Sequence, residues 1–160
     1  MRTILLTGMS GVGKSAVLHR LAGQEVLCVD LDYGWMREAD GERLIDVSAV
    51  RQFMHSHSAQ PIVLTGCAMN QGELDVDCTI LLTASAQTML ARIADRENPF
   101  GKDEASWRKI LADKEEFEPI LRARCDLVID TEQPLDVTVR QVGRLLKEDF
   151  NMRRTRFLCK

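Results

Sequence analysis

A glycine-rich segment near the N-terminus constrains the fold of this chain more than any other feature. Residues 8–15 read Gly-Met-Ser-Gly-Val-Gly-Lys-Ser and match the spacing G-x-x-x-x-G-K-[ST] in full. An apolar run at 4–7 precedes the segment and a helix-period stretch at 15–22 follows it, so it is expected to be a strand-to-helix turn. Its glycines would let successive backbone N–H groups point inward, and the helix start adds the positive end of its dipole. The segment is therefore expected to bind phosphate groups.

Two polar side chains at the end of this segment have specific expected roles. Lys14 would reach the β- and γ-phosphates of a nucleotide, and the Ser15 hydroxyl would ligate Mg²⁺. A structural turn with a solvated Lys14 is the alternative, which the strand before and the helix after disfavour. ATP and Mg²⁺ are thus the expected cofactors. The expected nucleotide contacts in this segment are Gly8, Ser10, Gly11, Val12, Gly13, Lys14, Ser15 and Ala16.

Short apolar runs alternate with helix-period segments along the rest of the chain, which is typical of a parallel α/β sheet. A polar stretch with Gly34 and Gly41 follows the second strand, and Pro119 is expected to kink or divide a long charged helix. The expected strands are 4–7, 25–29, 61–66, 79–82 and 127–129. The expected helices are 15–22, 47–55, a segment after Ser85, 103–124 and a segment opened by Pro134.

Length and charge limit the class of protein. The 160 residues are enough for one domain, expected to span 1–160 without a linker. An apolar fraction of 45% and a charged fraction of 28% are typical of a soluble globular protein. The net charge of −3 argues against a nucleic-acid partner. A basic cluster at 153–160 is interpreted as a solvated terminus, and the oligomeric state stays open.

The five cysteines indicate the redox state of the cellular compartment. They show no CxxC or metal-ligand spacing, which favours a reducing cytosol without disulfides. The apolar run at 4–7 ends in the glycine-rich segment, far short of a signal sequence or a membrane span. We therefore expect a cytoplasmic protein that has no membrane partner.

Two carboxylates follow the second expected strand. Asp30 and Asp32 are separated by one residue, so in an extended chain both side chains point the same way. The carboxyl ends of parallel strands are where open α/β sheets bind ligands. A phosphoryl-transfer site needs an anion near the Mg²⁺ shell and often a carboxylate that accepts the proton of the acceptor hydroxyl, and this pair could supply both. A solvated strand end is the alternative. Residues 33–37 could line an acceptor pocket or begin a helix.

A pair of arginines precedes a loop that contains helix-breaking residues. Arg92 and Arg96 are four apart and share one helix face. The loop that follows contains Pro99 and Gly101, which suits a lid that brings positive charge to a transferred phosphoryl group. We expect the lid at about 97–105 and a catalytic role for Arg96. A solvated basic face is the alternative.

These features, in order along nearly the whole chain, resemble the small P-loop kinases of the shikimate kinase and nucleoside-monophosphate kinase group, within the P-loop NTPase superfamily. The resemblance implies a three-layer α/β fold, with a five-stranded parallel sheet in the order 2-3-1-4-5 flanked by helices, and a lid. The matching elements are the Walker A loop at 8–15, the D-x-D at 30–32, the small-residue loop at 65–68, the arginine-rich segment at 92–102 and the segment 126–131.

The resemblance also implies further roles. Asp30 would lie near Mg²⁺ as a metal ligand with Ser15, and Asp32 would lie near the acceptor hydroxyl as a catalytic residue. Arg92 and Arg96 would contact adenine and phosphates, while Asp130 and Thr131 would help to bind the adenine or ribose. The acceptor-binding region would lie at about 33–60. Shikimate kinases carry an arginine two residues before a proline of the penultimate helix, where it holds the substrate carboxylate. Alignment on the proline of this chain places Phe117 there, so an acceptor other than shikimate is expected.

The sequence supports two functional hypotheses. The first is an ATP-dependent phosphotransferase (a kinase) that moves the γ-phosphoryl of Mg-ATP to a small-molecule acceptor. The second is a nucleotide-binding ATPase or switch that acts on a protein partner. An oligomeric ATPase of the AAA kind is disfavoured because the third strand ends in Thr65-Gly66 and not in acidic residues. The acidic net charge argues against a nucleic-acid end kinase.

Overall fold

A five-stranded parallel sheet forms the centre of the molecule. The computed structural model describes residues 2–95 and 103–147. The strands are β1 (Thr3–Thr7), β2 (Leu27–Asp30), β5 (Ile62–Thr65), β6 (Cys78–Thr83) and β7 (Leu127–Asp130). They are hydrogen-bonded in the order β2-β5-β1-β6-β7, which is 2-3-1-4-5 when only the strands of this sheet are counted. All four pairings are parallel, so the predicted fold class is confirmed.

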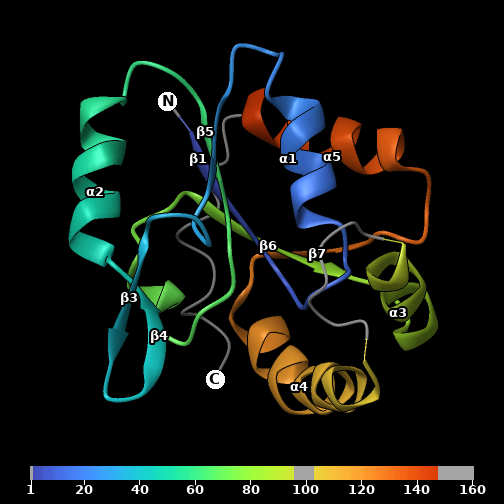
Figure 1. Ribbon diagram of the computed structural model, residues 1–160. Helices are drawn as coiled ribbons and strands as arrows, with labels where there is room; N and C mark the ends of the chain where they lie inside the picture. The colour runs from blue at the N-terminus through green and yellow to red at the C-terminus, as the bar shows by residue number, and fades with distance from the viewer. Residues whose placement is uncertain (1, 96–102, 148–160) are drawn as a thin grey trace, which may run out of the picture.

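Helices cover both faces of this sheet (Figure 1). They are α1 (Lys14–Leu21), α2 (Val47–Ser56), α3 (Ala86–Ala94), α4 (Glu104–Arg124) and α5 (Leu135–Lys147). One apolar core joins the sheet to α1, α3, α4 and α5, and a second core joins it to α2. The molecule therefore has three layers, with α1 and α5 in contact on one side and α2 on the other. No helix in the described parts of the chain is long and apolar enough to cross a membrane.

The polar stretch after the second strand is a β-hairpin, which the sequence analysis did not predict. Strands β3 (Met36–Ala39) and β4 (Glu42–Ile45) pair antiparallel as a separate two-stranded sheet. Their turn is Asp40-Gly41, and both residues have positive φ, 52° and 78°. An Asp-Gly pair with positive φ at both positions is a common two-residue hairpin turn. The helix considered for residues 33–37 is therefore wrong.

Of the two effects expected of Pro119 on the long helix, a kink or a division, the structure excludes the division. Pro119 lies inside α4, which continues to Arg124 as one element. The proline removes one backbone donor, but it does not divide the helix. As a result, a single 21-residue helix extends from residue 104 to the start of the last strand.

Candidate functional site

The glycine-rich loop joins β1 to α1 and is packed tightly from behind. Gly8, Gly11 and Gly13 have φ values of 140°, 86° and 97°, which side chains rarely adopt. A Cβ at Gly8 would clash with the carbonyl oxygen of Leu82, and one at Gly11 would lie 2.7 Å from the carbonyl oxygen of Met89. Because β6 and α3 press on the loop from one side, its backbone can only curl toward the other.

Helix α1 starts without a side-chain cap. Its N-cap residue, Gly13, makes no capping hydrogen bond, and the first turn contains no acidic residue. In contrast, Asp46, Ser85 and Asp103 cap α2, α3 and α4 through their side chains. The first N–H groups of a helix need an acceptor, and a helix N-terminus favours an anion. The start of α1 therefore suits a phosphate group.

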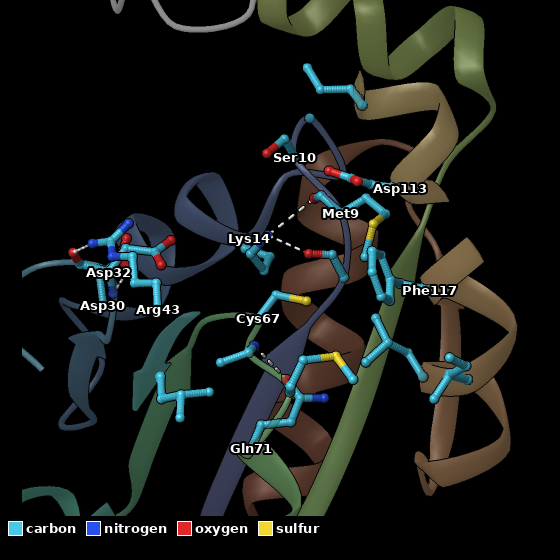
Figure 2. Close-up of a pocket in the computed structure, with 18 of the residues that line it drawn as sticks. Met9, Ser10, Lys14, Asp30, Asp32, Arg43, Cys67, Gln71, Asp113 and Phe117 are labelled. Atoms are coloured by element: carbon cyan, nitrogen blue, oxygen red, sulfur yellow. Dashed lines mark hydrogen bonds between the residues drawn. The ribbon is translucent and has the colours of Figure 1, made fainter. Parts of the chain in front are cut away.

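Lys14 holds its positive charge at the mouth of this loop. Its Nζ donates hydrogen bonds to the carbonyl oxygens of Gly8 at 2.6 Å and Met9 at 3.1 Å. Figure 2 shows the ammonium between these two carbonyls, facing the cavity. An ammonium is a compact charge with rotatable donors, so it can exchange the carbonyls for phosphate oxygens.

The two predicted carboxylates lie together beside the loop (Figure 2). Asp30 Oδ1 accepts a hydrogen bond from the Asp32 backbone N–H at 3.1 Å. The Arg43 guanidinium donates to the Asp32 carbonyl oxygen at 2.7 Å, which ties the hairpin to this turn. Asp30, Asp32 and Ser15 all line the same cavity as Lys14. The structure thus brings together the expected metal ligands, the expected base and the lysine.

A buried hydroxyl lies next to Asp30. Thr65 is the register partner of Asp30 on the neighbouring strand and of Leu6 on β1. Register partners on parallel strands point to the same face, here the one that α1 covers. The Thr65 side chain is buried and its Oγ1 has no hydrogen-bond partner among the described residues. A buried polar atom without a protein partner is rare, so the Thr65 hydroxyl suits a contact with water or with a ligand of this site.

These features fit the phosphates of a nucleotide together with Mg²⁺. The described residues contain no group of three or more His, Cys, Asp or Glu side chains that could hold a metal by themselves. Mg²⁺ does not need such a cage, because it keeps several waters and uses one or two protein oxygens together with phosphate oxygens. Ser15 and Asp30 can supply these protein oxygens, and Thr65 lies where it can hold a water.

One cavity of about 820 Å³ extends from the phosphate loop across the sheet edge to α4. Residues of the hairpin and of α4 line it, and a role for α4 in the site was not expected from the sequence. Of the nucleotide contacts predicted within the loop and the start of α1, Val12 and Ala16 are not part of its wall. Wall residues outside the loop and the acidic turn include Arg43, Cys67, Met69, Gln71, Lys109, Asp113, Phe117, Ile120 and Arg124.

Arg92 and Thr131 meet behind the loop, outside the cavity wall. The Arg92 guanidinium donates to the Thr131 hydroxyl at 2.9 Å and to its carbonyl oxygen at 2.6 Å. Thr131 is 5% exposed. Asp130 accepts a hydrogen bond from the Glu132 backbone N–H. In this arrangement Arg92 and Thr131 support the phosphate loop. The nucleotide contacts expected of Arg92, Thr131 and Asp130 stay predictions.

The lid falls largely outside the described residues. Arg96, with its expected catalytic role, and residues 97–102 belong to the part that is not described. Asp103 caps α4, and its side chain accepts a hydrogen bond from the Ser106 N–H at 2.9 Å. The end of the expected lid is therefore the start of a helix.

Two amides after β5 have different surroundings. The Asn70 side chain accepts from the Ile45 N–H at 3.0 Å and donates to the Ile45 carbonyl oxygen at 2.9 Å. It therefore fixes the end of the hairpin to this loop. Gln71 begins a short 3₁₀ helix and lines the cavity. The turn expected at 70–72 is present, and Gln71 also faces the site.

A phosphate-binding loop between the first strand and the first helix of a 2-3-1-4-5 sheet defines a P-loop protein. The match to the AAA domain family covers residues 4–118, more than half of the chain. The chain belongs to this family. Membership of this family does not decide whether the chain assembles into an oligomeric ATPase. The expectation that it does not, which rests on the lack of acidic residues at the end of β5, stays a prediction.

Solved structures of small P-loop kinases share the fold of this chain. A sugar kinase from Janibacter is 20% identical with a TM-score of 0.62, covering 92% of this chain and 95% of that one. Shikimate kinase from Acinetobacter baumannii, in complex with shikimate, is 19% identical with a TM-score of 0.59, covering 92% and 93%. Deoxyadenosine kinase from M. mycoides, with bound dATP, is 16% identical with a TM-score of 0.58, covering 92% and 100%.

Curated relatives are described only as nucleotide-binding proteins. The relative from Alcanivorax borkumensis is 29% identical over 90% of this chain and 54% of its own length. The relative from Alkalilimnicola ehrlichii is 28% identical over 92% and 54%. This chain spans about half the length of these relatives.

Proposed function

We propose that this chain is a phosphotransferase that binds Mg-ATP on the loop at 8–15 and moves the γ-phosphoryl group to a small molecule. The observation that carries the proposal is the single cavity that joins Lys14, Ser15 and the two carboxylates to a further space beside α4. The fold of the structural neighbours, several of them kinases, and the description of the relatives as nucleotide-binding support it.

The residues of the cavity suit each part of the transfer. The acceptor hydroxyl oxygen bonds to the γ-phosphorus while its proton passes to the Asp32 carboxylate, and the bond from that phosphorus to the β,γ-bridging oxygen breaks to release ADP. Lys14 offsets the charge that develops on the phosphoryl oxygens. Mg²⁺, when bound, neutralises phosphate charge and orients the triphosphate. Arg96 is proposed to add positive charge from the lid.

A nucleotide-dependent switch that acts on a protein partner is the second candidate. It is favoured by the relatives, which are about twice as long as this chain. In such a protein, ATP would be hydrolysed in response to the partner, and no small molecule would be phosphorylated.

The deciding experiment is an assay of ADP formation with Mg-ATP over a panel of nucleosides, sugars and other small alcohols. Lys14→Ala is expected to abolish turnover, while Lys147→Ala, on the exposed end of α5, leaves it unchanged. Asp32→Asn is expected to lower turnover far more than ATP affinity. If Lys14→Ala keeps normal ATP affinity and turnover, the proposal is wrong. ADP formation that responds to a protein partner and to no panel member favours the switch.

A further inference from the structure

The part of the cavity between the phosphate loop and α4 has an apolar wall. Phe117, Ile120 and Leu121 on α4 line it. Met9 from the phosphate loop and Met69 from the segment after β5 add thioether side chains. Figure 2 shows Met9 and Phe117 pointing toward one another, with Cys67 and Gln71 across the cavity. Such a wall suits a flat apolar group, because aromatic rings and methionine sulfur pack well on ring faces and edges.

Gln71 presents one polar group of fixed orientation to this wall. Its Oε1 accepts a hydrogen bond from the Thr7 hydroxyl at 2.9 Å and from the Ala68 backbone N–H at 3.4 Å. A backbone N–H can only donate, so this contact identifies the oxygen of the amide. The Nε2 group is therefore directed away from these partners, and Figure 2 shows it on the cavity side. Among the hydrogen bonds of the described residues, none occupies this Nε2.

The charged residues near this wall are paired, hydrogen-bonded or exposed to solvent. The Lys109 ammonium is 3.1 Å from an Asp113 carboxylate oxygen. Arg43 donates to the Asp32 carbonyl oxygen and lies on the side of the acidic turn (Figure 2). Arg124, at the end of α4, is exposed. An ionised carboxylate between Phe117 and Gln71 would lose water, and Arg124 could offset its charge only from the exposed end of α4.

We infer that the acceptor half of this cavity binds an uncharged hydroxyl compound with a planar ring that carries a hydrogen-bond acceptor. This inference rests on the proposed function and adds the substrate class. The ring lies against Phe117, and a ring nitrogen or carbonyl oxygen accepts from Gln71 Nε2. A nucleobase of a nucleoside and the ring of a heteroaromatic alcohol share this chemistry. A cavity of about 820 Å³ lies within the usual size range of small-molecule sites.

Direct binding tests the inference without turnover. Titration calorimetry is performed on the full chain saturated with a Mg-bound non-hydrolysable ATP analogue. The uncharged probes are adenosine, cytidine and 3-(hydroxymethyl)pyridine, and the charged probe is 3-(hydroxymethyl)benzoate. At least one uncharged probe is expected to bind at least tenfold more tightly than the benzoate. Comparison of the affinities for the nucleosides and for the pyridine shows whether the site binds a nucleobase or the ring of a heteroaromatic alcohol.

The Gln71→Glu variant tests the polar contact. Glutamate keeps an oxygen for Thr7 and Ala68 but replaces the donor with a charged acceptor, so the affinity for the uncharged probe is expected to fall about tenfold or more. Gln52→Glu, exposed on α2, introduces the same charge and is expected to leave this affinity unchanged. Phe117→Leu keeps an apolar wall without the ring and is expected to weaken binding less than Phe117→Asn does.

Three results would overturn the inference. One is tighter binding of the benzoate than of every uncharged probe, with loss of that binding in Arg124→Gln. Another is an unchanged affinity in Gln71→Glu. The third is that no uncharged probe binds while the ATP analogue does. In each case, nucleotide binding and the Lys14→Ala result still test the proposed function separately.

Discussion

Arg92 of α3 and Thr131, the residue after β7, form a brace that supports the phosphate loop from behind. The guanidinium donates to both oxygens of Thr131. The Thr131 hydroxyl oxygen lies 2.8 Å from the Val12 carbonyl oxygen and 3.0 Å from that of Thr83, and it donates to one of them. The brace therefore connects the loop to the ends of two strands, and this explains why an arginine predicted to face the nucleotide lies outside the cavity wall.

Loss of this brace is expected to weaken both stability and nucleotide binding. Hydrogen bonds to charged groups contribute about 1.5 to 3 kcal/mol each, so Arg92→Ala, which removes two of them, should lower the free energy of unfolding by about 3 kcal/mol. ATP affinity should fall about tenfold, because the loop loses part of its preorganisation. Urea denaturation and titration calorimetry measure the two effects, with Arg140→Ala on the exposed face of α5 as the control. A stable variant with weaker binding would instead assign Arg92 to the nucleotide.

The glycine at position 11 should tolerate no side chain. Its φ is 86°, and a Cβ would lie 2.7 Å from the main-chain oxygen of Met89 in α3. Strain and overpacking together are expected to cost Gly11→Ala about 3 kcal/mol of stability. ATP binding should be lost as well, since relief of the clash moves the loop. Gly23→Ala is the matched control, because a Cβ there meets nothing within 4 Å. Equal melting temperatures for the two variants would contradict this prediction.

The sequence predicted the donor side of the site well because its information is local. The loop motif, the flanking strand and helix, and the pair Asp30 and Asp32 each depend on neighbours a few residues away. Parallel strands also place their carboxyl ends at one edge, which is why residues from β1 and β2 could be expected to meet.

The acceptor side depends on contacts between distant segments, which no local pattern encodes. Phe117 was noted only as a departure from a family pattern, whereas packing of α4 places it in the cavity wall. Gln71 faces the cavity because Thr7, 64 residues earlier, holds its amide. The hairpin could have been predicted from its Asp40-Gly41 turn, since this dipeptide between short strands is a strong hairpin signal.

The hairpin should depend on a single amide. Asn70 makes both hydrogen bonds to the main chain of Ile45, the last residue of β4. Asn70→Ala would leave that N–H and that carbonyl oxygen without partners, at a cost of about 1 to 3 kcal/mol. Hydrogen exchange measured by mass spectrometry is expected to rise at least tenfold over residues 36–45 and to stay unchanged in the parallel sheet. Gln60→Ala, at an exposed position before β5, serves as the control, and uniform exchange in both variants would contradict the prediction.

Thiol alkylation should separate the cysteine of the cavity from the cysteine of the core. Burial, with a smaller contribution from the nearby Asp126 carboxylate, raises the pKa of Cys78 to about 11. Only the thiolate reacts, so at pH 8 about one Cys78 in a thousand is reactive in the folded chain. Cys67 lies in the cavity wall and is expected to react with iodoacetamide in the native protein. Peptide mapping by mass spectrometry measures both sites.

Bound nucleotide should affect the labelling of Cys67, whereas unfolding should affect the labelling of Cys78. A Mg-bound non-hydrolysable ATP analogue is expected to slow the labelling of Cys67, because the analogue would occupy the cavity that iodoacetamide must enter. Cys78 is expected to stay unmodified. In urea, Cys78 loses its burial and its pKa returns toward the ordinary value of about 8.5, so it should label at pH 8 about as fast as Cys67. Rapid labelling of Cys78 in the native state would show that the edge of the core beneath β6 opens to solvent. If the analogue does not change the rate of Cys67 labelling, the nucleotide binds away from residues 65–68.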